Sequence, residues 1–174
     1  MLRPRRMRDD DILACLDLDP GYTTDWAWQL ERREWGEETS FSLRPVKLPR
    51  PRTVDGYPII PPLEERLEDA DFALLLEDLA VAAYILAKRV GGRAILDLVV
   101  VGAPWRRQGL GGQLVGEVRA WARRCGLRFL EASVDARNAP AIRFLQKQGF
   151  TIRGVRDVVD REDEVTLLLA APLT

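Results

Sequence analysis

The chain has 174 residues, of which 47% are hydrophobic and 30% are charged, as in soluble globular proteins with a sizeable core. Lys and Arg total 26 while Asp and Glu total 27, and this near-balance argues against a dedicated nucleic-acid binder. The chain contains no histidine, which excludes Ser-His-Asp or Cys-His catalysis and histidine-ligated zinc. Any acid or base must therefore be a carboxylate, Tyr, Cys, Lys or a water molecule.

The cysteine content and the termini set expectations for the protein's surroundings. Cys15 and Cys125 form no metal-ligand pattern, and a chain of this size needs no disulfide, so we expect a cytoplasmic setting and no metal. Neither a signal peptide nor a membrane span is apparent. We expect a single domain over residues 1–174, a monomer or homodimer, with no nucleic-acid or membrane partner. The Pro-rich stretch 45–62 is expected as a surface excursion, by default a solvated loop, with an acceptor-site flap or a dimer contact as alternatives.

The first part of the chain carries weak signals for short elements. Residues 1–8 are consistent with an edge strand, and Asp9–Asp11 with the cap of a short helix that ends at Pro20-Gly21. The stretch 26–35 is amphipathic and contains three tryptophans, for which core packing is the main expectation and an aromatic wall against a cationic amine the alternative. Alternation over residues 39–48 indicates extended structure.

The remainder of the chain predicts a mixed sheet with helices, an α/β (α+β) fold. An antiparallel meander precedes a strand–helix–strand crossover, which requires parallel pairing of strands 95–101 and 129–134. The β-branched run Ile95–Val101 is typical of a central strand buried on both faces. A second helix opens at Asn138 and closes at Gly149, and a hairpin ends the chain. The expected long helix is 110–125, and the expected strands are 72–76, 79–87, 95–101, 129–134, 150–158 and 164–170.

The segment Arg106–Gly112, between a central strand and a long helix, is the most informative part of the sequence. Its glycines permit a tight turn and a close backbone approach to a ligand. The first amides of the helix have no intrahelical partner, and with the helix dipole, Arg106 and Arg107 they form a site suited to a pyrophosphate. A dinucleotide-binding fingerprint is excluded, because Leu114 stands where its third glycine is needed. A purely structural turn is the alternative.

With its flanks, this segment resembles the GNAT superfamily of N-acetyltransferases. Their pyrophosphate signature, Gln/Arg-x-x-Gly-x-Gly/Ala, is matched by Arg106, Gly109 and Gly111, and the preceding strand resembles their fourth strand. Asn138–Phe150 matches their Asn-x-x-Ala-x-x-Leu-Tyr-x-x-x-Gly-Phe segment at the family's spacing. The resemblance covers residues 72–170 and implies a GNAT fold, with acetyl-CoA bound where the two parallel strands splay apart.

The resemblance implies transfer of the acetyl group of acetyl-CoA to a primary amine, on a small molecule or a peptide, by direct attack in a ternary complex. Strand backbone would pair with the pantetheine arm, and the amide of Val101 would polarise the thioester carbonyl. Asn138 would contact the cofactor near its sulfur, or would serve as a helix N-cap, or both. The implied cofactor-binding residues are Val99, Val100, Val101, Arg106, Arg107, Gln108, Gly109, Leu110, Gly111, Gly112 and Asn138.

One position departs from the family. Many members place a Tyr in the last helix, where it protonates the departing thiolate, and the matching residue is Leu145. Phe144 before it has no hydroxyl, and Tyr22 and Tyr84 are the remaining candidates for this acid. The loss costs little, because a thiol with a pKa of roughly 8.5 is a tolerable leaving group. The missing Tyr also favours the alternative function, a non-catalytic acyl-CoA-binding sensor or interaction module.

The catalytic base is expected to be a carboxylate. An acceptor ammonium with a pKa around 10.4 must lose a proton before it attacks a thioester. Asp97 is the first candidate, as the single charged residue in the apolar run, and a structural pair with an Arg across the sheet is the equal alternative. Glu131 is the second candidate, although a half-exposed sheet residue is its commoner role. Asp97-Leu98 and the Trp-rich first half resemble streptothricin-acetyltransferase-like branches.

Overall fold

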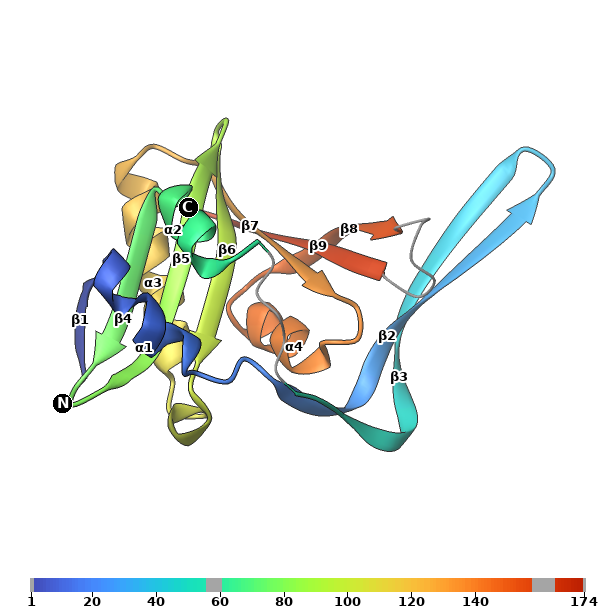
Figure 1. Ribbon diagram of the computed structural model, residues 1–174. Helices are drawn as coiled ribbons and strands as arrows, with labels where there is room; N and C mark the ends of the chain where they lie inside the picture. The colour runs from blue at the N-terminus through green and yellow to red at the C-terminus, as the bar shows by residue number, and fades with distance from the viewer. Residues whose placement is uncertain (1, 56–60, 158–164, 174) are drawn as a thin grey trace. The chain divides into compact units, whose positions relative to one another are not determined.

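The computed structural model describes residues 2–55, 61–157 and 165–173, whose helices and strands are labelled in Figure 1. The chain forms two compact units. The first unit comprises residues 1–21, 55–132 and 170–174, and the second comprises residues 22–54 and 133–169. In the ranges just given for the structure, no helix combines the length and the apolar character needed to cross a membrane.

The first unit is built on a sheet in which β1, β4, β5 and β6 pair antiparallel in that order and β7 pairs parallel with β6. The left-handed conformation of Gly91, with φ +58°, allows the tight turn between β5 and β6. In the second unit, β9 (Val165–Pro172) and β8 (Thr151–Asp157) follow the end of β7 in the strand order. The strand bounds are β1 Arg3–Arg6, β4 Phe72–Glu77, β5 Val81–Val90, β6 Arg93–Val101 and β7 Phe129–Asp135.

Helices cover both faces of this sheet. α1 (Ile12–Leu16) and α2 (Leu63–Glu68) lie on one face, and α3 (Leu110–Arg124) lies on the other (Figure 1). Each full burial of a large aliphatic side chain stabilises the fold by about 1.5–3 kcal/mol. The α1–α2 face buries Met7, Ile12, Cys15, Leu63, Leu75, Val81, Tyr84, Leu86 and Val100. α3 buries the helical stripe Leu110, Leu114, Val115, Val118 and Ala122.

The second unit is built around a long hairpin of β2 and β3. The Trp28 amide of β2 donates to the Ala136 carbonyl at 2.8 Å, and the Ala136 amide donates to the Val165 carbonyl at 2.8 Å. The Arg143 guanidinium of α4 lies 5.4 Å from the centre of the Trp26 ring, a cation–π contact. The elements are β2 Tyr22–Trp35, β3 Glu38–Val54, α4 Ala139–Lys147, β8 Thr151–Asp157 and β9 Val165–Pro172.

Two prolines of β3 lie where the ladder does not need their missing amides. The register shifts between Thr24 and Trp26, so that residues 48–51 of β3 lie opposite a single residue of β2. Pro49 and Pro51 fall in this bulge, and a bulge tolerates proline because no ladder hydrogen bond is lost. A strand is therefore compatible with this Pro-rich sequence.

Most expected elements are confirmed, including the parallel crossover, the long helix and the helix between Asn138 and Gly149. Two expectations are wrong. The solvated loop expected by default for the excursion 45–62 is instead strand as far as Val54, most of it exposed, and residues 56–60 lie outside the described residues. Ile95–Val101 is not buried on both faces, since most of its side chains are only half-buried. In the last hairpin, expected at 150–158 and 164–170, residues 158 and 164 lie outside the described residues.

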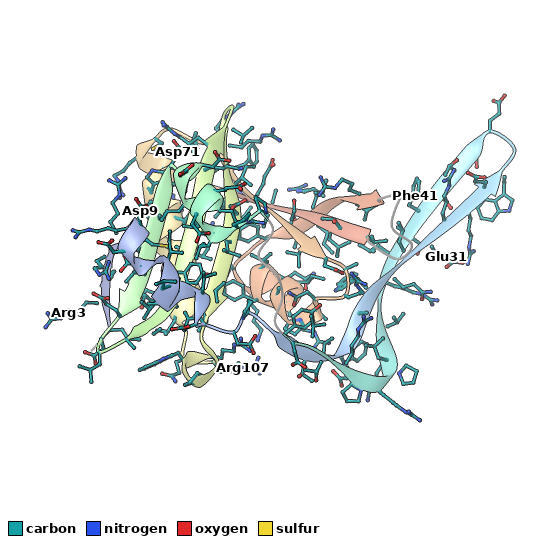
Figure 2. The ribbon with its side chains drawn as sticks, in the orientation of Figure 1. Arg3, Asp9, Glu31, Phe41, Asp71 and Arg107 are labelled. Atoms are coloured by element: carbon teal, nitrogen blue, oxygen red, sulfur yellow. The ribbon has the colours of Figure 1, made fainter. Side chains whose placement is uncertain are left out.

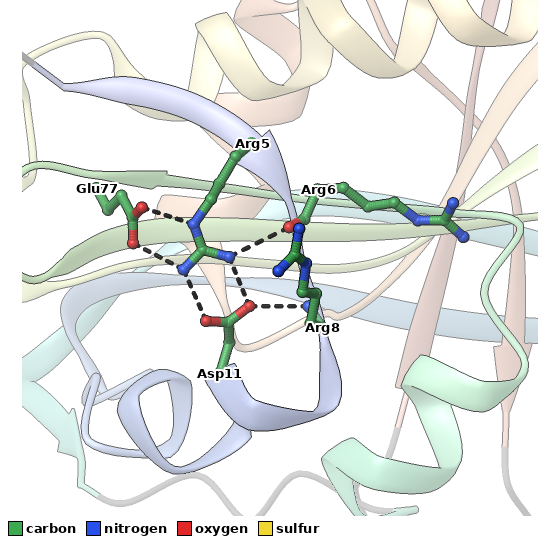
Figure 3. Close-up of polar contacts among 5 residues, drawn as sticks. All are labelled: Arg5, Arg6, Arg8, Asp11 and Glu77. Carbon is green, nitrogen blue, oxygen red and sulfur yellow. Dashed lines mark hydrogen bonds and ion pairs between the residues drawn. The ribbon is translucent and has the colours of Figure 1, made fainter.

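An ion-pair network joins β1, β4 and the first helical turn (Figure 3). Arg5 donates to the Glu77 carboxylate at 2.6 and 2.8 Å and to the Asp11 carboxylate at 2.7 Å through each Nη. Asp11 also accepts the Arg8 amide at 2.8 Å, so its side chain bonds to a residue that precedes it. It makes no capping hydrogen bond to α1, contrary to the expectation. Hydrogen bonds from Arg5 lower the pKa of Asp11 and the pKa of Glu77.

Candidate active site

The parallel ladder between β6 and β7 is short. It ends at the pair Leu96–Ala132, whereas β6 continues to Val101 and stays paired with β5 on its other edge. Successive strand residues direct their backbone polar groups to alternate edges. Alternate residues of 97–101 therefore present N–H and C=O groups at the edge where the ladder to β7 has ended. An extended ligand with amide groups can pair there as an added strand.

Asp97 occupies a β-bulge of β6. Leu86 of β5 pairs with Leu98 and the next residue, Ala87, pairs with Leu96, so Asp97 has no partner of its own on β5. Such an extra residue reverses the alternation of side chains beyond it. Leu98 consequently packs against the core on the α1–α2 face, and the Asp97 carboxylate lies beside α2.

Arg66 of α2 holds Asp97 in this bulge. Its Nη1 donates to Asp97 Oδ2 at 2.8 Å and to the Asp97 carbonyl at 3.4 Å, while its Nε donates to the Pro61 carbonyl at 3.2 Å. Both side chains of the pair are only 19% exposed, so each buried charge needs the opposite charge of its partner to offset the loss of hydration. The structural pair expected as an alternative is present, with a helix supplying the Arg. Within the described residues, Asp97 Oδ1 accepts no hydrogen bond.

The loop after β6 is fastened at both ends. The Gly102 amide donates to the Ala82 carbonyl at 2.9 Å, and a Cβ on Gly102 would lie 3.3 Å from that carbonyl and 2.9 Å from a leucine side chain. Arg106 donates from Nε to the Val101 carbonyl at 2.9 Å and from Nη2 to the Asp19 carbonyl at 2.6 Å. Arg106 thus braces the loop with the guanidinium that we expected to add charge for a phosphate.

The loop ends in two residues with left-handed backbone. Arg107, with φ +65°, is the one non-glycine residue of positive φ in the described parts of the chain, and Gly109 has φ +87°. Gly109 precedes α3, and its carbonyl accepts the first helical hydrogen bond, from Gln113 at 3.0 Å. Three amides come before that bond and have no partner in the helix, those of Leu110, Gly111 and Gly112.

These features together fit a diphosphate. Free amides and the helix dipole attract an anion, and the exposed side chain of Arg107 lies at the loop that joins β6 to α3 (Figure 2). Backbone strain at Arg107 is a feature that tends to be kept at ligand-binding loops. The Gln108 side chain donates to the Pro104 carbonyl at 3.0 Å, which braces the turn. The structure thereby brings residues 99–101 and 106–112 together at one end of β6.

Glu131 lies toward the other end of β6. It pairs in the ladder with Ile95, six residues before Val101, which is roughly 20 Å along a strand. Its carboxylate is 3.2 Å from Arg93, and the Glu131 side chain is 31% exposed. The commoner role of a half-exposed sheet residue is thus confirmed, and a catalytic role for Glu131 stays a prediction.

Two residues that the sequence analysis considered belong to the second unit. Asn138 Oδ1 accepts the Ala141 amide at 3.1 Å, so its role as the N-cap of α4 is confirmed. Its contact with a cofactor stays a prediction. Leu145 of α4 is buried at 4% exposure, so an apolar core side chain fills the place where many family members carry the Tyr.

Tyr84 and Cys15 are buried in the α1–α2 core. The Tyr84 hydroxyl has no hydrogen-bond partner in the described structure, and burial raises the pKa of Tyr84 above its usual range. Burial also raises the pKa of the Cys15 thiol to about 12. Both groups therefore stay protonated at neutral pH. A general acid has to contact its substrate, whereas Tyr84 is shielded from solvent.

Sequence reasoning missed Arg66 and the helix that carries it. Residues 63–68 follow a proline and carry two leucines four apart, Leu63 and Leu67, which is a signal for a helical turn. An Arg across the sheet was the expected partner of Asp97, whereas Arg66 reaches it from α2.

A protein-family comparison decides the assignment. The model of the "Acetyltransferase (GNAT) family" matches residues 25–150. The chain belongs to the GNAT acetyltransferase family. The expected fold, with its parallel strand pair in a mostly antiparallel sheet, is confirmed, and so is the expectation of an acetyltransferase.

Solved structures of GNAT acetyltransferases are similar over the whole chain. Nourseothricin acetyltransferase is 25% identical with a TM-score of 0.84, and the match covers 99% of each chain. A protein of Bacillus anthracis str. Ames assigned as a streptothricin acetyltransferase, in complex with acetyl coenzyme A, is 16% identical with a TM-score of 0.77 and 99% of each chain covered. The ribosomal-protein-S18-alanine N-acetyltransferase of Escherichia coli is 18% identical with a TM-score of 0.65, over 100% of this chain and 95% of that one. No curated protein matches the chain.

Proposed function

We propose that this GNAT acetyltransferase transfers the acetyl group of acetyl-CoA to a primary amine of a nourseothricin-like antibiotic. The expectation of acetyl-CoA as cofactor is confirmed by the family and by neighbours solved with it. The acceptor rests on the likeness to nourseothricin acetyltransferase, which covers 99% of both chains. That likeness includes the β2–β3 hairpin as well as the cofactor loop.

The first unit offers the groups that this cofactor needs. The free amides of the first turn of α3 bind diphosphate oxygens, and Arg107 adds positive charge beside them. The open edge of β6 at Val99, Val100 and Val101 pairs with the pantetheine arm. When bound, acetyl-CoA supplies an acetyl group activated as a thioester. From the resemblance, we also assign Asn138 to the sulfur end of the cofactor.

The chain's own residues then position the amine and handle its proton. The Val101 amide donates a hydrogen bond to the acyl oxygen, where negative charge develops during attack. Asp97 accepts a proton from the acceptor ammonium through Oδ1, while Arg66 holds Oδ2. Because a thiol has a pKa of roughly 8.5, no strong acid is needed at Leu145. We prefer Asp97 to Glu131 as the base, since Glu131 pairs with Arg93 far along the strand.

An amine panel tests this proposal. We expect thiol release from acetyl-CoA with nourseothricin at a higher kcat/KM than with an aminoglycoside, an alanine-terminated peptide or free lysine, and a product heavier by one acetyl group. Gly109→Trp fills the anion-binding turn and should abolish both turnover and the thermal shift caused by CoA. If another amine is acetylated and nourseothricin is not, the proposed class of acceptor is wrong. A CoA-induced thermal shift without turnover of any amine would favour the sensor.

A further inference from the structure

The turn end of the β2–β3 hairpin is a two-stranded ribbon whose large apolar side chains gather mainly on one face. Leu30 pairs with Leu43 and Arg32 pairs with Phe41, so Leu30, Leu43 and Phe41 share a face with Trp28, and Arg32 lies on this face beside Phe41. α4 contacts the hairpin at Trp26, and the turn end extends away from α4 (Figure 1). Phe41, labelled in Figure 2, is 60% exposed. An isolated two-stranded ribbon is marginally stable in water, so this exposed face calls for a partner.

The two edges of the ribbon differ in charge. On β2 every residue of 31–34 is charged, and ion pairs join Arg33 to Glu31 and Arg32 to Glu34. Charged side chains protect an edge against pairing with another strand. On β3 the five residues 39–43, Thr-Ser-Phe-Ser-Leu, carry no charge. The edge of β3 is therefore the one open to a further strand.

We propose that a second copy of this chain pairs antiparallel along this edge, about a twofold axis at Phe41. In this register Phe41 faces Phe41 of the second copy, Ser40 faces Ser42, and Thr39 faces Leu43. Aromatic pairs and polar pairs of this kind stabilise neighbouring strands. The two apolar faces then form one surface that continues from one copy to the other.

The charges at the two ends of this pairing select the register. Glu38 of each copy lies opposite Arg44 of the other, although neither has an opposite charge as its partner within the hairpin, where they pair with Trp35 and Gln29. Shifting one β3 strand against the other by two residues is the smallest shift that keeps the apolar faces on one side. This shift removes both Glu38–Arg44 pairs. Pro45 has no amide and ends the ladder just beyond Arg44.

A contact of this length is small for a protein interface, so the dimer should depend on concentration. Analytical ultracentrifugation of the full chain from low micromolar to several hundred micromolar measures this. Glu38→Arg places like charges opposite each other and should weaken the dimer at least tenfold, as should Arg44→Glu. The double variant restores opposite charges and should recover the dimer. A chain that is monomeric throughout this range, or a double variant that stays as weak as its parents, would overturn the proposal.

Cross-linking tests the register directly. Exposed Cys125 is replaced by Ser, while buried Cys15 is left in place. Phe41→Cys in this background should form an intermolecular disulfide on mild oxidation, because opposed residues of antiparallel strands lie within disulfide range. Arg32→Cys, on the neighbouring strand directly beside Phe41, is the matched control and should not cross-link. Thermal unfolding of each variant reports whether it is folded. A dimer that cross-links equally well through Arg32→Cys would contradict pairing along β3.

Discussion

The Arg66 guanidinium binds both the carboxylate and the carbonyl of Asp97, at 2.8 and 3.4 Å. The bulge leaves Asp97 without a partner on β5, and Arg66 replaces that missing support from α2. The residues that follow in β6, Val99–Val101, are those proposed to pair with the cofactor. One side chain therefore fixes the position of the proposed base and of the backbone beside it.

Replacing the proposed base should slow the reaction and leave cofactor binding intact. Asp97→Asn keeps the size of the side chain but accepts no proton, so we expect kcat to fall about 10²-fold at neutral pH. The loss should shrink at high pH, where more of the acceptor amine is already neutral in solution. Thiol release across a pH series and the thermal shift with CoA measure both effects. Glu131→Gln is the matched control, and undiminished turnover by Asp97→Asn at every pH would remove Asp97 from the mechanism.

If Arg66 acts through Asp97, its removal should have no additional effect once Asp97 is gone. Arg66→Ala leaves the half-buried carboxylate unpaired, and we expect a loss of about 1–3 kcal/mol in the free energy of unfolding together with a lower kcat. Arg66→Lys keeps the charge but not the fork of donors, so it should recover part of kcat. The double variant with Asp97→Asn should turn over no more slowly than Asp97→Asn alone. Additive losses in kcat would mean that Arg66 acts independently of Asp97.

The sequence made parts of this site predictable and left others out of reach. Glycines between a strand and a helix indicate the anion-binding turn, and a lone charge in an apolar strand draws attention to Asp97. The register does not follow from alternation alone, so neither the bulge nor the turn of Asp97 toward α2 could be foreseen. A six-residue helix after a Pro-rich stretch shows little hydrophobic periodicity, so the helix that carries Arg66 was not predicted. The bonds of Arg106 to two carbonyls depend on the fold of distant segments.

The two left-handed residues of the loop should respond in opposite ways to substitution. A Cβ on Gly109 meets nothing within 4 Å, so Gly109→Ala should cost only backbone strain, about 1–2 kcal/mol. Arg107→Gly relieves strain, so its thermal stability should equal or exceed that of the parent, while its affinity for CoA falls several-fold through the lost charge. Calorimetric titration with CoA and thermal unfolding measure the two effects. Arg107→Lys, which keeps the charge, should bind CoA nearly as well as the parent; equal weakening in both variants would exclude a role for the charge.

The buried hydroxyl of Tyr84 should be dispensable. It has no hydrogen-bond partner in the described structure, so Tyr84→Phe removes a desolvated polar group and loses no bond. We expect the free energy of unfolding to stay the same or rise by up to about 1 kcal/mol, with kcat unchanged. Leu86→Ala in the same core is the comparison, with an expected loss of about 2–5 kcal/mol. A large fall in kcat for Tyr84→Phe would instead identify Tyr84 as the acid that Leu145 does not provide.

The Arg5 network should make the fold sensitive to acid. Hydrogen bonds from Arg5 lower the pKa of Asp11 and of Glu77 in the folded chain. A lowered folded pKa gives stability that is fully present above the unfolded pKa, near 4, and is lost as the pH falls through the folded value. Urea unfolding over a pH series should therefore show the free energy of unfolding falling from about pH 5 downward.

Removing one carboxylate of this network tests that origin. Asp11→Asn should lower the free energy of unfolding by about 1–3 kcal/mol at neutral pH, because it leaves part of the Arg5 fork without its acceptor. Its stability should also change less than that of the parent between pH 5 and more acidic solutions, since one of the linked protons no longer binds. Asp10→Asn, exposed on the same turn, is the control and should follow the parent at every pH. An Asp11→Asn variant with the parent's full acid dependence would place the sensitive carboxylates elsewhere in the chain.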